Sequence, residues 1–325
     1  MNVPVLDVDD LTVVLGSGER QAIVLDGVSL RIDPHETVAL VGESGAGKTM
    51  LALAVMRLLP RGMRVTGGHI RLDGEDLVGV PETVVRAKRG GEMAMIFQDP
   101  QSSLHPSFRV GAQIAEAIRA HDRGTSRSEA RGKVVDLLAR VGVPDPAARA
   151  RDYPHQLSGG TRQRVMIAMA IANAPRLLIA DEATTALDVT VQAQVLEVLR
   201  SAQDATGAAM LVVTHDLGVV ASVADRVLVM YAGRIVEAGR VADVLAAPVH
   251  PYTRGLLAAV PRLDRTAPVR AIPGQPPSPF TRPTGCAFRP RCEWADARCA
   301  SDVPALDPVA GAGHDVACHH AGALC

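Results

Sequence analysis

A glycine-rich stretch near the start of the chain, VALVGESGAGKTMLALAVM, has residue types and spacing that suit phosphate binding. A strand before it and a helix after it would let backbone N–H groups surround phosphate oxygens at a helix N-terminus. Lys48 would then reach the β- and γ-phosphates, and Thr49 would ligate Mg²⁺. The predicted phosphate site comprises Gly42, Glu43, Ser44, Gly45, Ala46, Gly47, Lys48 and Thr49.

Two acidic residues lie at the end of a second apolar run, LLIAD. Asp181 is its last residue, and Glu182 follows directly. Taken alone, acids after a strand are most often solvated loop residues or helix caps. Beside a phosphate loop, Asp181 can hold Mg²⁺ through its water shell, and Glu182 can take a proton from an attacking water. These residues predict a nucleoside triphosphate site and leave kinases, GTPases and motor ATPases open.

The elements that position these residues alternate short apolar runs with helical stretches. VALVG, LLIAD and MLVVT are apolar on both faces, which is typical of buried parallel strands. Residues 1–40 predict strands and hairpins, and residues 99–172 carry helical periodicity. VLVMYAGRIVEAG predicts a hairpin that turns at Ala232 and Gly233. The expected fold class is therefore α/β, with an N-terminal antiparallel β-subdomain and a helical subdomain at about 99–172.

The composition limits the classes of protein that remain. In 325 residues, 34 Lys and Arg balance 35 Asp and Glu, so no general attraction to nucleic acid is expected. The N-terminus MNVPVLDVDD is acidic, and no window approaches the ~18 uncharged apolar residues of a membrane span. We expect a soluble chain that is not exported on its own and keeps its thiols reduced.

The segment LSGGTRQRVMIAMA predicts a second anion site. Ser158, Gly159 and Gly160 precede a helix that Pro175 would stop, so bare backbone amides lie at a helix N-terminus. As a purely structural feature, Ser-Gly-Gly is also an ordinary helix cap. Other motifs are needed to choose between the two readings.

Those motifs are present, and together they resemble the nucleotide-binding subunits of ABC transporters. They are Gln98 in MIFQDP, Asp188 at the end of the ALD that follows the acidic pair, and His215 in LVVTHD. The resemblance covers about residues 5–260. It implies a P-loop ATPase core that binds ATP and Mg²⁺.

The resemblance also implies a role for each matched residue. Ser158, Gly159 and Gly160 would face the P-loop of a second subunit, so that ATP is sandwiched between two chains. Gln98 would sense Mg²⁺ and the attacking water and relay to membrane subunits, and Asp188 would lie at the dimer interface. His215 would contact the γ-phosphate. Catalysis would then rest on Glu182, His215 and Gln98, and the Mg²⁺ ligands would be Thr49, Gln98 and Asp181.

The adenine site departs from the family pattern. Many ABC subunits stack adenine on an aromatic residue near the N-terminus, whereas the first aromatic residue here is Phe97. We expect adenine to rest on aliphatic side chains such as Leu15 or Val24, which forfeits about 1 kcal/mol of stacking.

Two segments resemble the oligopeptide and dipeptide importer branch of this family. VHPYTRGLLAAVPRLD carries His250, Pro251, Tyr252 and Thr253, and FQDPQSSLHPSF continues after the glutamine as in that branch. The first segment could equally be a helix start with a packed aromatic. Residues 104–110 would lie near a coupling helix of a membrane subunit, with core packing as the alternative.

This branch implies a peripheral subunit at the cytoplasmic face of the membrane. Its partners would be two transmembrane permease subunits, an extracytoplasmic peptide-binding protein and a second ATPase, either a related chain or a copy of this one. ATP binding and hydrolysis would drive alternating access in the permeases. The alternatives are an importer of another solute, such as a metal chelate or glycoside, a non-transport ABC ATPase acting on DNA or ribosomes, and an inactive regulatory subunit.

All cysteines of the chain lie near its end, after the proline-rich stretch IPGQPPSPFTRPTG: Cys286, Cys292, Cys299, Cys318 and Cys325. Their spacings are not the C-x2-C pairs of zinc knuckles. The first four suit a [4Fe–4S] cluster, which the resemblance also implies, with zinc second and unligated or disulfide-bonded thiols third. Cys325 is the expected spare thiol. We predict an ATPase domain at 1–262 and an irregular, metal-stapled extension at 263–325.

Overall fold

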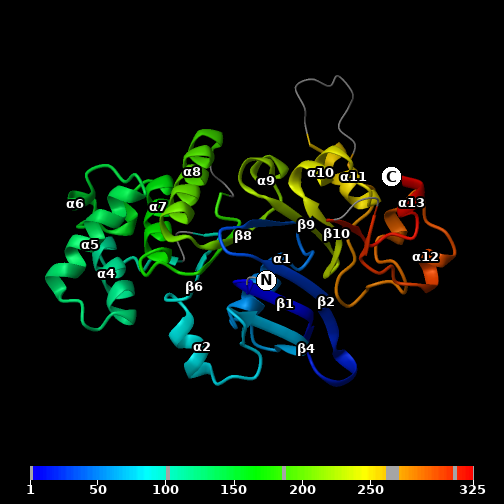
Figure 1. The fold of residues 1–325 in the computed structure, drawn as a ribbon, viewed down its shortest axis with the longest axis horizontal. Coiled ribbons are helices and arrows are strands. Elements are labelled where there is room, and N and C mark those ends of the chain that lie inside the picture. The colour runs from blue at the N-terminus through cyan, green and yellow to red at the C-terminus, as the bar shows by residue number, and fades with distance from the viewer. Residues whose placement is uncertain (1–2, 100–102, 185–187, 261–270, 310–312, 325) are drawn as a thin grey trace. The chain divides into compact units, whose positions relative to one another are not determined.

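The computed structural model describes residues 3–99, 103–184, 188–260, 271–309 and 313–324. The chain forms two compact units (Figure 1). The first unit comprises residues 1–6, 32–36 and 79–212, and the second comprises residues 7–31, 37–78 and 213–325.

The first unit is built on strands in the order β8-β7-β6. These are β8 (Ala209–Thr214), β7 (Leu177–Asp181) and β6 (Met93–Ile96). β6 and β7 run parallel, with Ala94 opposite Leu178. Every residue of β7 is buried, as the apolar run LLIAD predicts for a strand covered on both faces.

The helices of the first unit include the long amphipathic ones. Their bounds are α2 (Glu82–Lys88), α4 (Val110–His121), α5 (Arg127–Arg140), α6 (Pro146–Arg149), a 3₁₀ turn (Pro154–Gln156), α7 (Gly159–Ala170) and α8 (Val189–Thr206). α5 begins with a capping box, in which Ser126 Oγ accepts from the Glu129 N–H and the Glu129 carboxylate accepts from the Ser126 N–H. α4, α5 and α7 contact one another, so residues 99–172 contain the helices that their periodicity predicts.

The second unit contains the N-terminal strands. β1 (Leu6–Leu15), β2 (Ala22–Ile32), β4 (Met63–Leu72) and β5 (Glu75–Asp76) form a sheet in the order β2-β1-β4-β5. β4 and β5 are antiparallel, with Leu72 opposite Glu75.

Further strands of the second unit follow the order β11-β12-β10-β9-β3. Their bounds are β3 (Thr37–Val41), β9 (Arg226–Tyr231), β10 (Arg234–Arg240), β11 (Asp307–Pro308) and β12 (His314–Val316). β3 and β9 are parallel, and β9 and β10 form a hairpin. Ala232 and Gly233 turn this hairpin with φ of 47° and 80°, the left-handed pair of a type I′ turn, which confirms the predicted hairpin.

The second unit has short helices and an aromatic core. The helices are a 3₁₀ turn (Gly18–Arg20), α1 (Lys48–Val55), α9 (Leu217–Val223), α10 (Val241–Ala246), α11 (Pro251–Ala258), the 3₁₀ turn η3 (Arg289–Arg291), α12 (Arg298–Ser301) and α13 (Ala321–Leu324). Tyr231, Tyr252 and Phe288 pack together, with ring centroids 4.6 to 5.5 Å apart, in one core cluster with Val41.

This core changes the expected character of the C-terminal extension. The sequence predicts an irregular tail held mainly by a metal, but Phe288 is buried in the aromatic core, and β12 pairs with β10. The extension is therefore attached by apolar burial and strand pairing.

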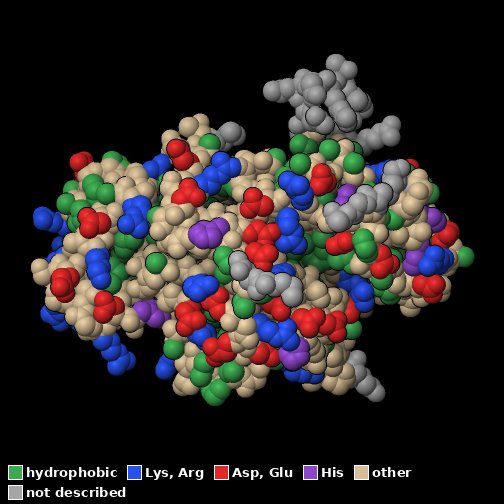
Figure 2. Space-filling view, in the orientation of Figure 1, with side chains coloured by type: hydrophobic (Ala, Val, Ile, Leu, Met, Phe, Trp, Pro, Cys, Tyr) green, Lys and Arg blue, Asp and Glu red, His purple; other side chains and the backbone are tan. Residues whose placement is uncertain are grey.

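None of the described helices is both long enough and apolar enough to span a bilayer. Acidic and basic side chains are interspersed over the face drawn in Figure 2, in keeping with the balanced composition.

Candidate nucleotide and cysteine sites

The loop between β3 and α1 has the geometry of a phosphate-binding loop. Gly42 follows β3 with φ 155°, and a Cβ there would collide with the carbonyl oxygen of Met230 in β9. Gly47 has φ 110° and precedes α1, whose first turn carries no acidic side chain. The loop N–H groups and the positive end of the helix dipole therefore favour an anion.

Lys48 lies folded over this loop. Its side chain is buried, and Nζ donates hydrogen bonds to the carbonyl oxygens of Gly42, at 2.7 Å, and Glu43, at 3.0 Å. The predicted role in phosphate binding requires Lys48 to exchange these carbonyl oxygens for phosphate oxygens. Thr49, the predicted Mg²⁺ ligand, is the next residue of α1.

Glu43 ties the loop to two residues that the sequence analysis did not assign to this site. Its backbone N–H donates to the Tyr252 hydroxyl at 2.7 Å. Its carboxylate accepts two hydrogen bonds from the Arg291 guanidinium, at 2.6 and 2.9 Å. These partners are 209 and 248 residues away along the chain, so no local sequence pattern could have revealed them.

The HPYT segment is both a helix start and a contact of the phosphate loop. His250 caps α11, with Nδ1 accepting from the Tyr252 N–H at 3.0 Å, and Pro251 occupies the first turn. Burial lowers the pKa of His250 to about 3, so the ring is neutral and Nδ1 can accept. The packed-aromatic interpretation is therefore right for Tyr252, and its hydroxyl adds the link to Glu43.

The acidic pair lies at the carboxyl end of β7. Asp181 is the last residue of the strand and is buried, and Glu182 follows with φ 47°. A left-handed backbone costs a residue with a side chain about 1–3 kcal/mol and is common at functional sites. Gln98 Nε2 donates to Glu182 Oε2 at 2.8 Å, so the first unit brings together two of the three predicted catalytic residues.

The signature segment forms the N-terminus of α7. Ser158 caps the helix by accepting from the Thr161 N–H at 3.3 Å, and Ser158 and Gly159 are exposed. A Cβ on Gly160 would lie 2.9 Å from Val191 Cγ1 in α8, so the two helices approach closely there. Asp188 caps α8 by accepting from the Val191 N–H at 3.0 Å. The predicted second anion site and Asp188 therefore lie near each other.

The other predicted residues are placed as follows. His215 comes directly after β8 and is exposed. Leu15 is partly exposed at the end of β1, whereas Val24 is only 8% exposed, so Val24 offers little surface to a base. Phe108 is 56% exposed, while Leu104 is buried, so only part of the predicted coupling segment packs in the core. Part of the motif that ends in Asp188, residues 186 and 187, lies outside the described residues.

Four cysteines line one small pocket: Cys286, Cys292, Cys299 and Cys318. No disulfide joins any of these four described cysteines, and Cys325 lies outside the described residues. Burial raises the pKa of all four thiols, that of Cys292 to about 11. Four sulfur donors from separate segments, one buried and three partly buried, line one pocket and fit a metal centre.

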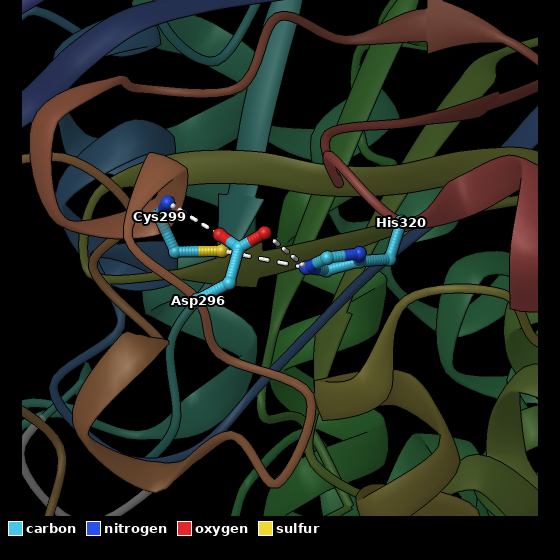
Figure 3. A group of neighbouring side chains, drawn as sticks. All are labelled: Asp296, Cys299 and His320. Atoms are coloured by element: carbon cyan, nitrogen blue, oxygen red, sulfur yellow. Dashed lines mark hydrogen bonds and ion pairs between the residues drawn. The ribbon is translucent and has the colours of Figure 1, made fainter.

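His320 also lines this pocket, and Figure 3 shows it next to Cys299 and Asp296. Cys299 Sγ lies 3.8 Å from His320 Nε2, and that nitrogen lies 3.5 Å from a carboxylate oxygen of Asp296. His320 is not among the predicted ligands, although it follows Cys318 by two residues. A mixed set of S, N and O donors suits zinc, which keeps zinc as the second candidate metal.

The loop between β3 and α1 defines a P-loop nucleotide-binding protein. Residues 25–185 match the family model described as ABC transporter, and residues 236–299 match the one described as oligopeptide/dipeptide transporter, C-terminal region. A Brucella ovis protein named as a peptide import ATP-binding protein is 49% identical over 94% of this chain and 94% of its own length.

Two further comparisons extend this result. The oligopeptide transport ATP-binding protein OppD of Mycobacterium tuberculosis is 50% identical, over 97% of this chain and 52% of its own. The ABC transporter cassette MJ0796, solved as a dimer, superposes with a TM-score of 0.64 at 27% identity, over 73% of this chain and 98% of that one. A second structure of MJ0796, with a TM-score of 0.65, is bound to ADP and Pi.

This chain belongs to the family of ABC transporter ATP-binding proteins. It has the P-loop ABC ATPase fold that the motifs predicted, and its family couples ATP hydrolysis to transport.

Proposed function

We propose that this chain is the energy-coupling ATPase subunit of an importer for dipeptides or oligopeptides. The observation that carries the proposal is the combination, in one chain, of an ABC ATPase with the C-terminal region of oligopeptide and dipeptide transporters. The likeness to the Brucella ovis protein over nearly the whole of both chains supports it. We assign the ATPase to residues 1–262 and the extension to residues 263–325.

We assign the chemistry of ATP hydrolysis to the predicted residues. The loop from Gly42 to Thr49 binds the phosphates, with Lys48 on the β- and γ-phosphates. Thr49, Asp181 and Gln98 would hold Mg²⁺, which would neutralise charge on the phosphates, and His215 would contact the γ-phosphate.

Glu182 takes the proton from the attacking water. The Gln98 amide, 2.8 Å from the Glu182 carboxylate, holds this base in place. A fixed base and a fixed water lower the entropic cost of reaching the transition state.

We propose that the active form is a dimer of ATPase subunits. Ser158 and Gly159 are exposed at the N-terminus of a twelve-residue helix, where they can receive the γ-phosphate held by a second subunit. Asp188, near this helix end, lies at the same interface. The dimeric structure of MJ0796 supports this arrangement, and the second subunit is either a copy or a related chain.

The transport cycle then follows from the position of ATP between subunits. ATP binding closes the dimer, hydrolysis reopens it, and two permease subunits follow this motion at the cytoplasmic face of the membrane. Exposed Phe108 is the best-placed apolar side chain of the segment 104–110 for contact with a permease. An extracytoplasmic binding protein supplies the peptide.

Substitution Glu182→Gln tests the catalytic assignment. ATP turnover should fall by at least about 100-fold, because a neutral amide cannot accept the proton, while ATP stays bound and the dimer accumulates on a sizing column. Glu197→Gln, an exposed change in α8 of the same unit, is the control and should leave turnover unchanged. Turnover unaffected by Glu182→Gln would remove this residue from the role of base.

A pull-down from the native membrane tests the transport assignment. Two permeases and a peptide-binding protein should co-purify with the chain. A co-purifying protein that binds a glycoside or a metal chelate would replace peptide as the substrate. Binding of the pure chain to duplex DNA without any permease would contradict transport.

We further propose that Cys286, Cys292, Cys299 and Cys318 hold a [4Fe–4S] cluster. The proposal is supported by their convergence on one pocket, where the partial burial of the thiols disfavours the charged thiolate unless a cation compensates it. When bound, such a cluster would cross-link the irregular loops, as metals do in small domains.

Anaerobic purification tests the cluster. The protein should absorb broadly near 400 nm and contain about four irons per chain. Cys292→Ser should lose both signals, and Cys325→Ser, the change at the predicted spare thiol, should keep them. Stoichiometric zinc without iron would reject the cluster in favour of a zinc site.

A further inference from the structure

Arg291 connects the C-terminal extension directly to the phosphate-binding loop. It is the last residue of η3, its side chain is 4% exposed, and both terminal nitrogens donate to the Glu43 carboxylate, at 2.6 and 2.9 Å. This bidentate geometry fixes the orientation of the carboxylate as well as its position. Glu43 is the second residue of the loop that would receive the phosphates.

Contacts from the extension and from β9 hold Arg291 in place. Its Nε donates to the carbonyl oxygen of Pro273 at 2.8 Å, and its guanidinium carbon lies 5.9 Å from the ring centroids of Tyr231 and Phe288. Cys292, the next residue, lines the cysteine pocket. We call residues 286–309 and 313–320, which carry the four pocket cysteines, the cysteine module. Arg291 lies in this module between Phe288 and Cys292, so we expect a change in the fold of the module to shift its side chain.

Glu43 in turn helps to fix the shape of the phosphate-binding loop. Its N–H donates to Tyr252 Oη, and its carbonyl oxygen accepts from Lys48 Nζ at 3.0 Å. When Lys48 turns to the phosphates, its contact with this carbonyl oxygen is lost. Tyr252 and Arg291 then remain as the side chains that hold Glu43, so their contribution is greatest in the nucleotide-bound state.

Charge adds to this geometric effect. The Glu43 carboxylate lies in a loop that must attract a polyanion, and only a compensating cation makes that position tolerable for ATP. Arg291 supplies the cation. Without it, the carboxylate would repel the phosphates, and Glu43 would lose one of the two side chains that hold it.

We propose that Arg291 is a positioning residue of the phosphate-binding loop, and that the cysteine module sets the affinity for ATP through it. The inference deepens the proposed ATPase function and rests on it. Arg291 acts through Glu43 and needs no contact with ATP.

The first experiment compares Arg291→Gln with wild type in the full-length chain. The Kd for ATP, measured by titration calorimetry, and the KM for ATP should both rise about 10-fold. The kcat at saturating ATP should stay within about two-fold of the wild-type value, because the lost interaction contributes to ATP binding. Arg298→Gln is the matched control. Arg298 also precedes a module cysteine, but it is exposed and forms a surface ion pair with Asp302 at 4.0 Å. An unchanged KM in Arg291→Gln would overturn the proposal.

A double-mutant cycle with Glu43→Gln separates positioning from general damage. Glu43→Gln removes the carboxylate that Arg291 compensates, so the double variant should bind ATP more tightly than Arg291→Gln alone. Effects that simply multiply would show that Arg291 does not act through Glu43. If Arg291→Gln does not fold, Arg291→Lys replaces it. KM should then rise less, because lysine keeps the positive charge but cannot donate two parallel hydrogen bonds to the Glu43 carboxylate.

The last comparison tests the module itself. Cys292→Ser should raise KM for ATP in the same direction as Arg291→Gln, whereas Cys325→Ser should not. An unchanged KM in Cys292→Ser protein that has lost its metal would overturn the coupling. Failure of the proposed function looks different, since wild type would then neither bind nor hydrolyse ATP.

Discussion

Glu237 in β10 gives the sharpest prediction about how the extension is attached. Its side chain is fully buried, and its carboxylate accepts three hydrogen bonds: from the Val249 N–H at 2.7 Å, the His250 N–H at 3.1 Å and His314 Nε2 at 2.8 Å. One side chain therefore joins β10 to the start of α11 and to β12. The perturbation is Glu237→Gln, which keeps the shape and exchanges one acceptor oxygen for a donor.

The magnitude follows from these contacts. The amide oxygen of glutamine can still accept from Val249 and His314, but its NH₂ then faces the His250 N–H, donor against donor. One charge-assisted hydrogen bond is lost and one buried N–H is left unpaired, at a cost of about 3 kcal/mol in the free energy of unfolding. The unfolding entropy is about 2.1 cal/mol/K per residue. For the 325 residues of the chain, this loss of free energy should lower the melting temperature by roughly 4 °C.

Scanning calorimetry of the full chain, with the same metal content in each sample, measures this shift. Glu293→Gln, an exposed change in the extension, is the control and should melt within about 1 °C of wild type. A Glu237→Gln protein with the same melting temperature as wild type would refute the role of this carboxylate in attaching the extension.

Two further predictions concern the nucleotide site. Gly42→Ala should reduce ATP affinity by at least about 10-fold in a binding titration, because the new Cβ would collide with the Met230 carbonyl oxygen. Gly45→Ala is the control. Its Cβ would meet nothing within 4 Å, so it should reduce ATP affinity less, despite the φ of 82° at Gly45. Leu15→Tyr should improve ATP affinity up to about 5-fold by adding a ring for adenine to stack on. Unchanged affinity would place the base away from the end of β1.

The sequence predicted those parts of the structure that depend on local pattern. The buried runs LLIAD and MLVVT became β7 and β8, and Ala232 with Gly233 turned the predicted hairpin, because hydrophobic period and turn chemistry act over a few residues. The same holds for the signature, where Ser158 caps a helix as its residue type requires.

The sequence could not predict contacts that depend on tertiary packing. The tail was expected to have little core of its own, yet Phe288 packs on Tyr231 and Tyr252, which come from distant segments. The bond between Gln98 and Glu182, 84 residues apart, likewise depends on how two strands end at the same edge. His320 was not considered as a ligand type because its distance from Cys299 arises only when the loops converge.

The shared aromatic core has a practical consequence for protein engineering. A chimera that grafts this extension onto another ATPase of the family would bring Phe288 and Arg291 without the surfaces that receive them. A workable graft must transfer Tyr231, Tyr252 and Glu43 at the same time, because the two parts have one interior between them. The extension is thus not an interchangeable cassette, and its boundary in sequence is not its boundary in space.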